Sequence, residues 1–289
     1  AIGGYVIIMM TLASILAVLQ ESKVWSHEAL PSLTLMGKFS VLGCCFMWFF
    51  MSFVGVNLAI LKKILTLGTS DLAQDINTVV EPFIGAAVLA MFVGETHVSG
   101  LENLPPPNRV PAPVYVANHG SQIDAAVVYI IQRRFKWIAK QSVAFLPGVG
   151  GIMTLGQHVM IQRKGKNKGS VRNLFTKSQE AVESGIPMFL FPQGTRNMAQ
   201  RLPFKDGAFI IAENSKAPLV PISIDIPMDA WNSLYPFSLL WTKRCPVVKV
   251  TVHKVVPVTG EESRDSLKQI CYDRIYSVLP PVGENEKSK

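Results

Sequence analysis

The sequence has few cysteines, and none in the arrangements that bind metals or form disulfide frameworks. Its 289 residues include four cysteines with no C-x-x-C spacing: Cys44, Cys45, Cys245 and Cys271. Neither a zinc site nor a disulfide-stabilised scaffold is therefore expected, and a reducing compartment is favoured. The chain also lacks an H-E-x-x-H helix, a P-loop and a G-x-S-x-G elbow. We therefore expect no metal site, no P-loop nucleotide binding and no covalent catalysis through serine.

Charge is absent from two long segments near the beginning of the sequence. Residues 1–20 and 40–61 carry no charged side chain, and Lys62 and Lys63 follow at once. Roughly 20 apolar residues span a bilayer as a helix. We therefore expect residues 1–63 to form a membrane-embedded helical hairpin, either spanning the bilayer or dipping into one leaflet. By the positive-inside rule, the two lysines predict that the rest of the chain faces the cytosol. The expected membrane is the endoplasmic reticulum or a bacterial inner membrane.

The overall charge is basic, with 28 Lys and Arg against 20 Asp and Glu, a formal net charge of +8. Such a balance is compatible with nucleic acid, an anionic membrane or an anionic substrate. No basic stretch interleaves with aromatic residues as in a single-strand binder. Beside two apolar segments, the charge favours membrane lipids or an anionic substrate, and no nucleic-acid partner is expected.

From about residue 96 the pattern changes to short β-branched runs that alternate with helical ones. This alternation predicts an α/β domain over residues 96–279, with a mostly parallel sheet flanked by helices. The expected strands are Val114–Ala117, Lys136–Ala139, His158–Gln162, Met188–Phe191, Leu219–Ile224 and Val247–Val256. The expected helices are Ser121–Arg134, Gly169–Ser184, Asp206–Asn214 and Glu262–Val278.

Two further segments flank this domain. Residues 64–95 are expected to form a linking helix that lies at the membrane interface or packs on the domain, broken near Pro82. Residues 280–289 include the polar run GENEKSK and are expected to be a disordered tail.

The stretch NHGSQID, residues 118–124, supports two hypotheses. In one, Ser121 caps a helix and Asp124 closes a capping box, which requires nothing of His119. In the other, His119 follows a strand end, where ligands collect in open α/β sheets, and Asp124 orients its imidazole as a general base. The two hypotheses are compatible because a carboxylate has two oxygens.

The stretch FPQGTR, residues 191–196, follows another expected strand. Gly194 permits a turn that points backbone N–H groups outward, Thr195 adds a hydroxyl, and Arg196 adds a planar fork for phosphate. This pattern fits an anion-binding turn, although an ordinary turn with a surface arginine also explains it. Arg163, where a third strand stops, is a further candidate for a specific anion contact.

The order of these motifs resembles that of the glycerolipid acyltransferases, and most closely the lysophosphatidate acyltransferases. The motifs are N-H-x4-D at 118–124, I-x-R at 161–163, F-P-x-G-T-R at 191–196 and V-P-I at 220–222. Four further stretches also resemble this family: GLENLP (100–105), IAK (138–140), LPGVGGIM (146–153) and LPFKDGAF (202–209). The resemblance covers roughly residues 75–260.

The resemblance implies roles for individual residues. His119 is implied as the general base toward an acceptor hydroxyl, and Asp124 as the carboxylate that orients it. The implied phosphate contacts are Lys140, Arg163, Gly194, Thr195 and Arg196. Acyl transfer also needs oxyanion donors, and a backbone N–H near Gly120 is the expected one.

The implied reaction moves an acyl chain from acyl-CoA or acyl carrier protein to the sn-2 hydroxyl of a lysophosphatidate, with no metal or cofactor. The family usually has Glu in the third motif, where this chain has Gln193, which is expected to contact the acceptor without a negative charge. Two alternatives remain: acylation of glycerol-3-phosphate or another lysophospholipid, and a non-catalytic lipid-binding relative.

Overall fold

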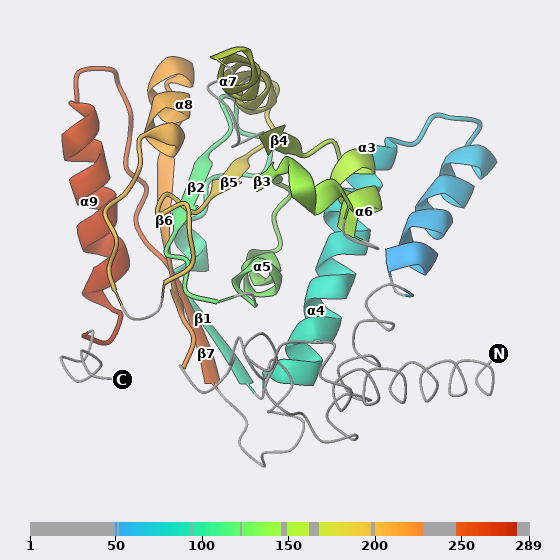
Figure 1. Ribbon diagram of the computed structural model, residues 1–289, viewed down its shortest axis with the longest axis horizontal. Coiled ribbons are helices and arrows are strands. Elements are labelled where there is room, and N and C mark those ends of the chain that lie inside the picture. Colours follow the sequence, from blue (N-terminus) through green and yellow to red (C-terminus); the bar gives the residue numbers. More distant parts are fainter. Residues whose placement is uncertain are drawn as a thin grey trace, which may run out of the picture.

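The computed structural model describes residues 50, 52–93, 95–121, 123–145, 149–161, 168–197, 200–227 and 247–281. Within these residues a seven-stranded sheet lies between two layers of helices (Figure 1). The strand order is β1-β7-β6-β2-β5-β3-β4. Neighbouring strands pair in parallel except β6 and β7, which are antiparallel. The predicted α/β class with a mostly parallel sheet is confirmed.

All the expected strands form, and one more joins them. The expected strands are β2 (Val114–Ala117), β3 (Lys136–Lys140), β4 (Val159–Ile161), β5 (Met188–Leu190), β6 (Leu219–Asp225) and β7 (Val247–Val252). The additional strand is β1 (Glu95–Ser99), an edge strand whose residues alternate between exposed and half-buried. Its polar sequence gives a weak strand signal. It forms because β7 offers it a parallel partner, with Glu95 opposite Val247.

Strand β2 shows why both faces of the sheet are covered. All its residues are buried, and successive side chains point to opposite faces. Val114 and Val116 belong to the apolar cluster that includes α7 (Lys168–Glu183), α8 (Gly207–Ser215) and α9 (Arg264–Ser277). Tyr115 and Ala117 belong to the cluster that includes α4 (Glu81–Phe92) and α5 (Asp124–Val127). A continuous apolar run is what a strand covered on both faces requires.

The helices of the domain differ in detail from the prediction. Their bounds are α5 (Asp124–Val127), α6 (Val149–Leu155), α7 (Lys168–Glu183), α8 (Gly207–Ser215) and α9 (Arg264–Ser277). The short helix α5 begins three residues after the predicted Ser121 and continues as a 3-10 turn over Val128–Ile131. Further 3-10 turns span Leu101–Asn103 and Gln141–Phe145, and α6 was not expected.

The segment before the sheet is helical but irregular. It comprises α3 (Leu72–Asp75), a π-helical stretch Ile76–Val80 and α4 (Glu81–Phe92). The irregular stretch ends two residues before Pro82, in line with the predicted break near this proline. The residues on both sides of Pro82 are helical, so its missing N–H falls within a continuous helical segment.

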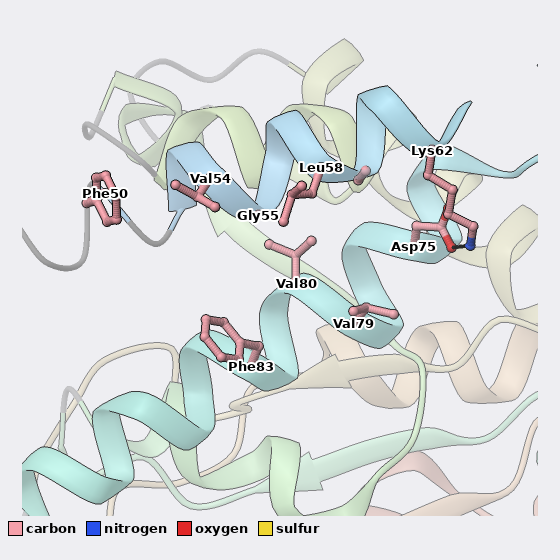
Figure 2. Close-up of a pocket in the computed structure, with 10 residues that line it drawn as sticks. Phe50, Val54, Gly55, Leu58, Lys62, Asp75, Val79, Val80 and Phe83 are labelled. Carbon is pink, nitrogen blue, oxygen red and sulfur yellow. Dashed lines mark hydrogen bonds and ion pairs between the residues drawn. The ribbon is translucent and has the colours of Figure 1, made fainter. Parts of the chain in front are cut away.

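Residues 52–65 form a helix that packs beside the π-helical stretch and α4. Gly55 allows the close approach, because an added Cβ would lie 2.7 Å from Cγ1 of Val80. Farther out the two segments leave an apolar groove of about 480 Å³ (Figure 2). Its lining includes Phe50, Val54, Leu58, Val79 and Phe83.

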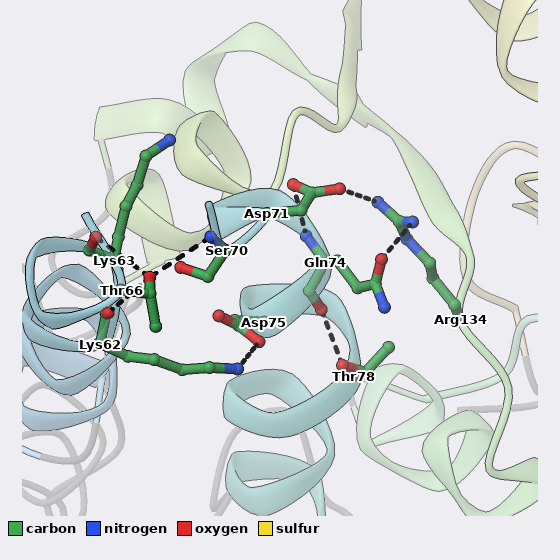
Figure 3. A network of polar contacts seen from close by, with 9 residues as sticks. All are labelled: Lys62, Lys63, Thr66, Ser70, Asp71, Gln74, Asp75, Thr78 and Arg134. Carbon is green, nitrogen blue, oxygen red and sulfur yellow. Dashed lines mark hydrogen bonds and ion pairs between the residues drawn. The ribbon is translucent and has the colours of Figure 1, made fainter. Parts of the chain in front are cut away.

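Polar contacts hold these helices to each other and to the domain (Figure 3). Lys62 Nζ lies 2.6 Å from Asp75 Oδ1, which joins the helix at 52–65 to α3. Arg134 reaches Asp71 at 3.5 Å and the side-chain oxygen of Gln74 at 3.4 Å.

Most of the membrane hairpin expected over residues 1–63 lies outside the described residues, and the part that is described, residues 52–63, is helical. Among the residues that are described, no helix is both long enough and apolar enough to cross a bilayer.

Candidate active site

The predicted site residues follow the carboxyl ends of neighbouring strands. His119 comes directly after β2 and Asn118, and the segment from Phe191 comes directly after β5. β2 pairs in parallel with β5 and with β6, so these strand ends meet at one edge of the sheet. Asn118 fixes the end of β2, since its amide donates to Ile224 O and accepts from Ile224 N, both at 2.8 Å.

His119 and Asp124 are in direct contact, as predicted for a base and its orienting carboxylate. Nδ1 of His119 lies 2.8 Å from Oδ2 of Asp124. The carboxylate side chain is 2% exposed and the imidazole 20%. An ionised carboxylate can only accept, so Nδ1 is the donor in this contact, and in the neutral imidazole the lone pair is then on Nε2. This is the tautomer that a general base needs.

The helix-cap hypothesis for this stretch is only half correct. Asp124 Oδ2 also accepts from Gly120 N at 2.8 Å and from Ser121 N at 3.0 Å, as in one half of a capping box. However, the residue that caps α5 is Ile123, and Ser121 Oγ accepts from Ile123 N at 3.3 Å in a turn before the helix. The prediction for Ser121 is therefore met in its hydrogen bonds, although α5 begins three residues later, at Asp124.

The same contacts bear on the expected oxyanion donor. The N–H of Gly120 donates to Asp124, so it is already used within the His119 turn. An oxyanion donor near Gly120 remains a prediction, and the N–H of Gly120 itself is not available for it. One oxygen of Asp124 instead gathers Nδ1 and two backbone N–H groups, which fixes the whole turn around the imidazole.

The segment after β5 holds His119 from the other side. The Phe191 ring stacks on the imidazole, with centroids 4.0 Å apart and planes 10° apart. Gln193 Oε1 accepts from His119 N at 2.6 Å, and Asn197 N donates to His119 O at 2.9 Å. The main chain and one ring face of His119 are therefore all in contact with residues 191–197.

These contacts fix the side chain of Gln193 against the backbone of His119. It is 2% exposed, and its side-chain oxygen is committed to the His119 backbone. An amide and a carboxylate can both accept a hydrogen bond here, so the change from the usual Glu preserves this contact. A contact with the acceptor remains a prediction.

The turn at Gly194 has the conformation that favours glycine, with φ of +72°. Its own N–H donates to Phe191 O at 3.0 Å and so points back into the turn, while the outward direction of other N–H groups there remains a prediction. An added Cβ at Gly194 would lie 2.7 Å from Nζ of Lys205, which places a cation against this turn. Lys205 lies in the quoted LPFKDGAF stretch, but sequence reasoning gave it no role.

The remaining predicted anion contacts are less closely gathered. Thr195 and Arg196 are exposed on the loop after β5. Lys140 is exposed at the end of β3, which is separated from β2 by β5. Arg163 lies outside the described residues, so its predicted contact stays a prediction. The part of the chain that the structure describes contains no group of three or more His, Cys, Asp or Glu side chains suited to a metal ion.

The chain was compared with known proteins in sequence and in structure. Residues 95–225 match the family described as Acyltransferase. A 1-acyl-sn-glycerol-3-phosphate acyltransferase from Chlamydomonas reinhardtii is 34% identical over 185 residues, covering 64% of this chain and 53% of that protein. The human 1-acyl-sn-glycerol-3-phosphate acyltransferase beta is 30% identical over 163 residues, covering 55% of this chain and 56% of that protein. The chain thus spans about half the length of these relatives.

Among solved structures, the chain is similar to the 1-acyl-sn-glycerophosphate (LPA) acyltransferase PlsC from Thermotoga maritima. The TM-score is 0.61 at 21% sequence identity, over 83% of this chain and 95% of that chain. This likeness establishes the fold. The sequence matches confirm the resemblance predicted from the ordered motifs.

Proposed function

We propose that the protein, whose residues 95–225 match the acyltransferase family, is a lysophosphatidate acyltransferase. It transfers an acyl chain from a thioester to the free hydroxyl of a 1-acylglycerol-3-phosphate and forms phosphatidate. The observation that carries the proposal is the contact between His119 Nδ1 and Asp124 Oδ2 at 2.8 Å, at the carboxyl end of β2.

The proposed chemistry is direct transfer without an acyl-enzyme. Nε2 of His119 takes the proton of the acceptor hydroxyl while its oxygen attacks the thioester carbonyl. The tetrahedral intermediate collapses, the carbon–sulfur bond breaks, and the leaving thiolate takes the proton back from Nε2. Asp124 stabilises the imidazolium between these two steps. A general base of this kind contributes about 10²–10⁴-fold to the rate.

We propose that the acceptor phosphate is held by Arg196, Lys140 and Arg163, with Gly194 and Thr195 shaping the turn between them. Holding acceptor and thioester together can offset about 7–11 kcal/mol of the barrier. Arg196 is exposed on the loop that also holds His119, which supports its place in this grip. The donor is acyl-CoA or acyl carrier protein. Both substrates contain apolar chains, and we propose that residues 1–63 attach the enzyme to the membrane with the domain facing the cytosol.

A donor-by-acceptor panel on the purified protein tests this function. Thiol release from acyl-CoA and from acyl carrier protein is measured with lysophosphatidate, glycerol-3-phosphate and a lysophospholipid whose phosphate bears a headgroup. We expect release that depends on lysophosphatidate and disappears in His119→Ala. Preference for glycerol-3-phosphate would assign the sibling reaction, and no acceptor-dependent release with any pair would contradict an acyltransferase.

A further inference from the structure

A second histidine, His158, forms a buried pair with Glu81 behind the candidate site. Nε2 of His158 donates to Glu81 Oε1, and the two side chains are 0% and 4% exposed. Glu81 opens α4, whereas His158 directly precedes β4. The proposed reaction has no use for this pair, and sequence reasoning assigned a strand to His158 and no role to Glu81.

The contacts of this pair define its protonation. Trp137 N–H can only donate, and it lies 2.9 Å from Nδ1 of His158. Nδ1 is therefore the acceptor and the proton is on Nε2, directed at the carboxylate. The side-chain nitrogen of Asn77 also lies 3.3 Å from this Nε2. Both ring nitrogens are occupied, so this imidazole has no lone pair to offer a substrate.

The second oxygen of Glu81 continues the network. Tyr129 OH donates to Glu81 Oε2 at 3.0 Å and accepts from Trp137 Nε1 at 2.7 Å. Burial and the neighbouring carboxylate raise the pKa of Tyr129 well above its ordinary value, so the hydroxyl keeps its proton. Trp137 is thus held twice, by its backbone N–H to His158 and by its indole N–H to Tyr129.

The held indole ring is connected to the base through one intervening ring. Trp137 and Phe191 stack with centroids 5.7 Å apart and planes 23° apart. Phe191 in turn stacks on His119 at 4.0 Å. The plane of Phe191 limits rotation of the imidazole about its Cβ–Cγ bond. Rotation matters because it changes the direction in which Nε2 points.

We infer that this buried network positions His119 for proton transfer by holding the Phe191 ring flat against it. The members are Glu81, Tyr129, Trp137 and His158, all of them positioning residues. The inference rests on the proposed function, since it assigns the network a part in that reaction. Its physical basis is preorganisation, because an ångström of misplacement far from the chemistry can cost about 10²-fold in rate.

Tyr129→Phe is the first test, since it removes one hydroxyl and keeps the ring. We expect kcat to fall by about 10-fold with KM nearly unchanged, because the acceptor grip is not touched. Tyr115→Phe is the matched control. It removes a hydroxyl from a fully buried tyrosine whose ring packs on Phe135 and Phe189. Equal kcat losses in the two variants would overturn the inference.

A double variant separates positioning from stability. If Tyr129 acts through Phe191, then Tyr129→Phe added to Phe191→Leu lowers kcat no further, since the ring that transmits the effect is gone. If instead the two losses multiply, the route through Phe191 is wrong. Trp137→Phe, which keeps a ring against Phe191 but loses the indole N–H, replaces Tyr129→Phe if that protein does not fold.

The last readout does not depend on activity. Imidazole ¹⁵N chemical shifts of His119 report which nitrogen carries the proton, in wild type and in Tyr129→Phe. We expect a single Nδ1–H tautomer in wild type and Tyr115→Phe, and a mixture of tautomers in Tyr129→Phe. Identical spectra would overturn the inference even if the protein proved inactive on every acceptor, whereas wild-type inactivity alone would count only against the proposed function.

Discussion

The chain places one histidine–carboxylate pair at the carboxyl end of the central strand β2, partly open to solvent, and another in the interior. His119 is 20% exposed with Asp124 at 2%, whereas His158 and Glu81 are 0% and 4% exposed. Among the described residues, Nε2 of His119 has no hydrogen-bond partner, while both nitrogens of His158 are occupied. The residue types are nearly the same, so their surroundings decide which pair can exchange a proton.

The difference shows what a potential base needs beyond a carboxylate. In both pairs the acid fixes a tautomer, but the tautomers are opposite. Asp124 draws the proton to Nδ1 and leaves Nε2 with a lone pair, whereas Glu81 draws it to Nε2 because a backbone N–H already occupies Nδ1. A strand end gives the first pair an open side, and a helix packed on the sheet closes the second.

The largest expected effect comes from removing the base at the edge. His119→Ala should lower kcat by about 10²–10⁴-fold, since general-base catalysis is lost. The midpoint of thermal unfolding should barely change, because the imidazole is partly exposed and Asp124 keeps two backbone donors. Acyl-transfer rates and thermal unfolding on the same preparation measure both. Near wild-type turnover would remove His119 from the mechanism.

Removing the interior histidine should act on stability. His158→Ala leaves the buried Glu81 carboxylate with Tyr129 as its remaining donor, and loss of a hydrogen-bond partner by a buried polar group costs about 1–3 kcal/mol of unfolding free energy. Urea titration measures the loss. As a control, replacing both partners, in Glu81→Met with His158→Leu, should recover much of the stability because no lone charge remains buried. A His158→Ala protein as stable as wild type would contradict this account of the pair.

A substitution of Arg196, near the His119–Asp124 pair, separates binding of the acceptor phosphate from the chemical step. Arg196→Ala should raise the apparent KM for the phosphorylated acceptor by roughly 10-fold, in the range of one charge-assisted hydrogen bond, and leave kcat almost unchanged. Steady-state kinetics over a range of acceptor concentrations gives both constants, and Arg172→Ala, on α7, is a control for loss of one positive charge. If kcat fell while KM held, Arg196 would be stabilising the transition state instead of anchoring the phosphate.

The smallest expected effect concerns a third histidine, His253. It shows how burial changes the pKa of an imidazole that has no carboxylate partner among the described residues. Burial, and secondarily the charge of Arg274, lowers the pKa of His253 below its usual 6.5, and Ser223 Oγ lies 2.7 Å from its Nε2. Protonation is therefore harder in the folded state. The stability that the neutral ring contributes is present above the unfolded pKa and is lost as the pH falls from there through the folded value.

We therefore expect the unfolding midpoint of wild type to fall more between about pH 7.5 and about pH 5.5 than that of His253→Gln. His97→Gln serves as the comparison, because the His97 side chain is 56% exposed and paired at the surface. Parallel pH dependence in wild type and His253→Gln would show that His253 titrates alike in the folded and unfolded states.

Much of the edge site could be predicted because its signals are local. His119 and Asp124 are five residues apart, and a strand end followed by a helical turn brings such residues together. The positive φ of Gly194 follows from a turn between a strand and a loop. The strands themselves follow from short β-branched runs, which fit a sheet covered on both faces.

The errors arose where one local pattern fits two arrangements. Ser121 and Asp124 have capping-box spacing, but Asp124 turns its oxygen to the imidazole and α5 starts at Asp124 itself. The same oxygen also accepts from the Gly120 N–H, a contact that motif spacing does not reveal. β1 has almost no strand signal of its own and depends on β7, about 150 residues farther along the chain.

The sequence by itself determined the α/β class, the order of the motifs and the pairing of His119 with Asp124, because periodicity and short spacing act within a few residues. Only the tertiary structure decided that Gln193 holds the His119 backbone across 74 residues, and that Glu81 meets His158 across 77. Such contacts depend on which strands become neighbours and which helix covers them. Packing of the whole chain decides which strands are neighbours and which helix covers them, and the spacing of residues within one motif does not predict it.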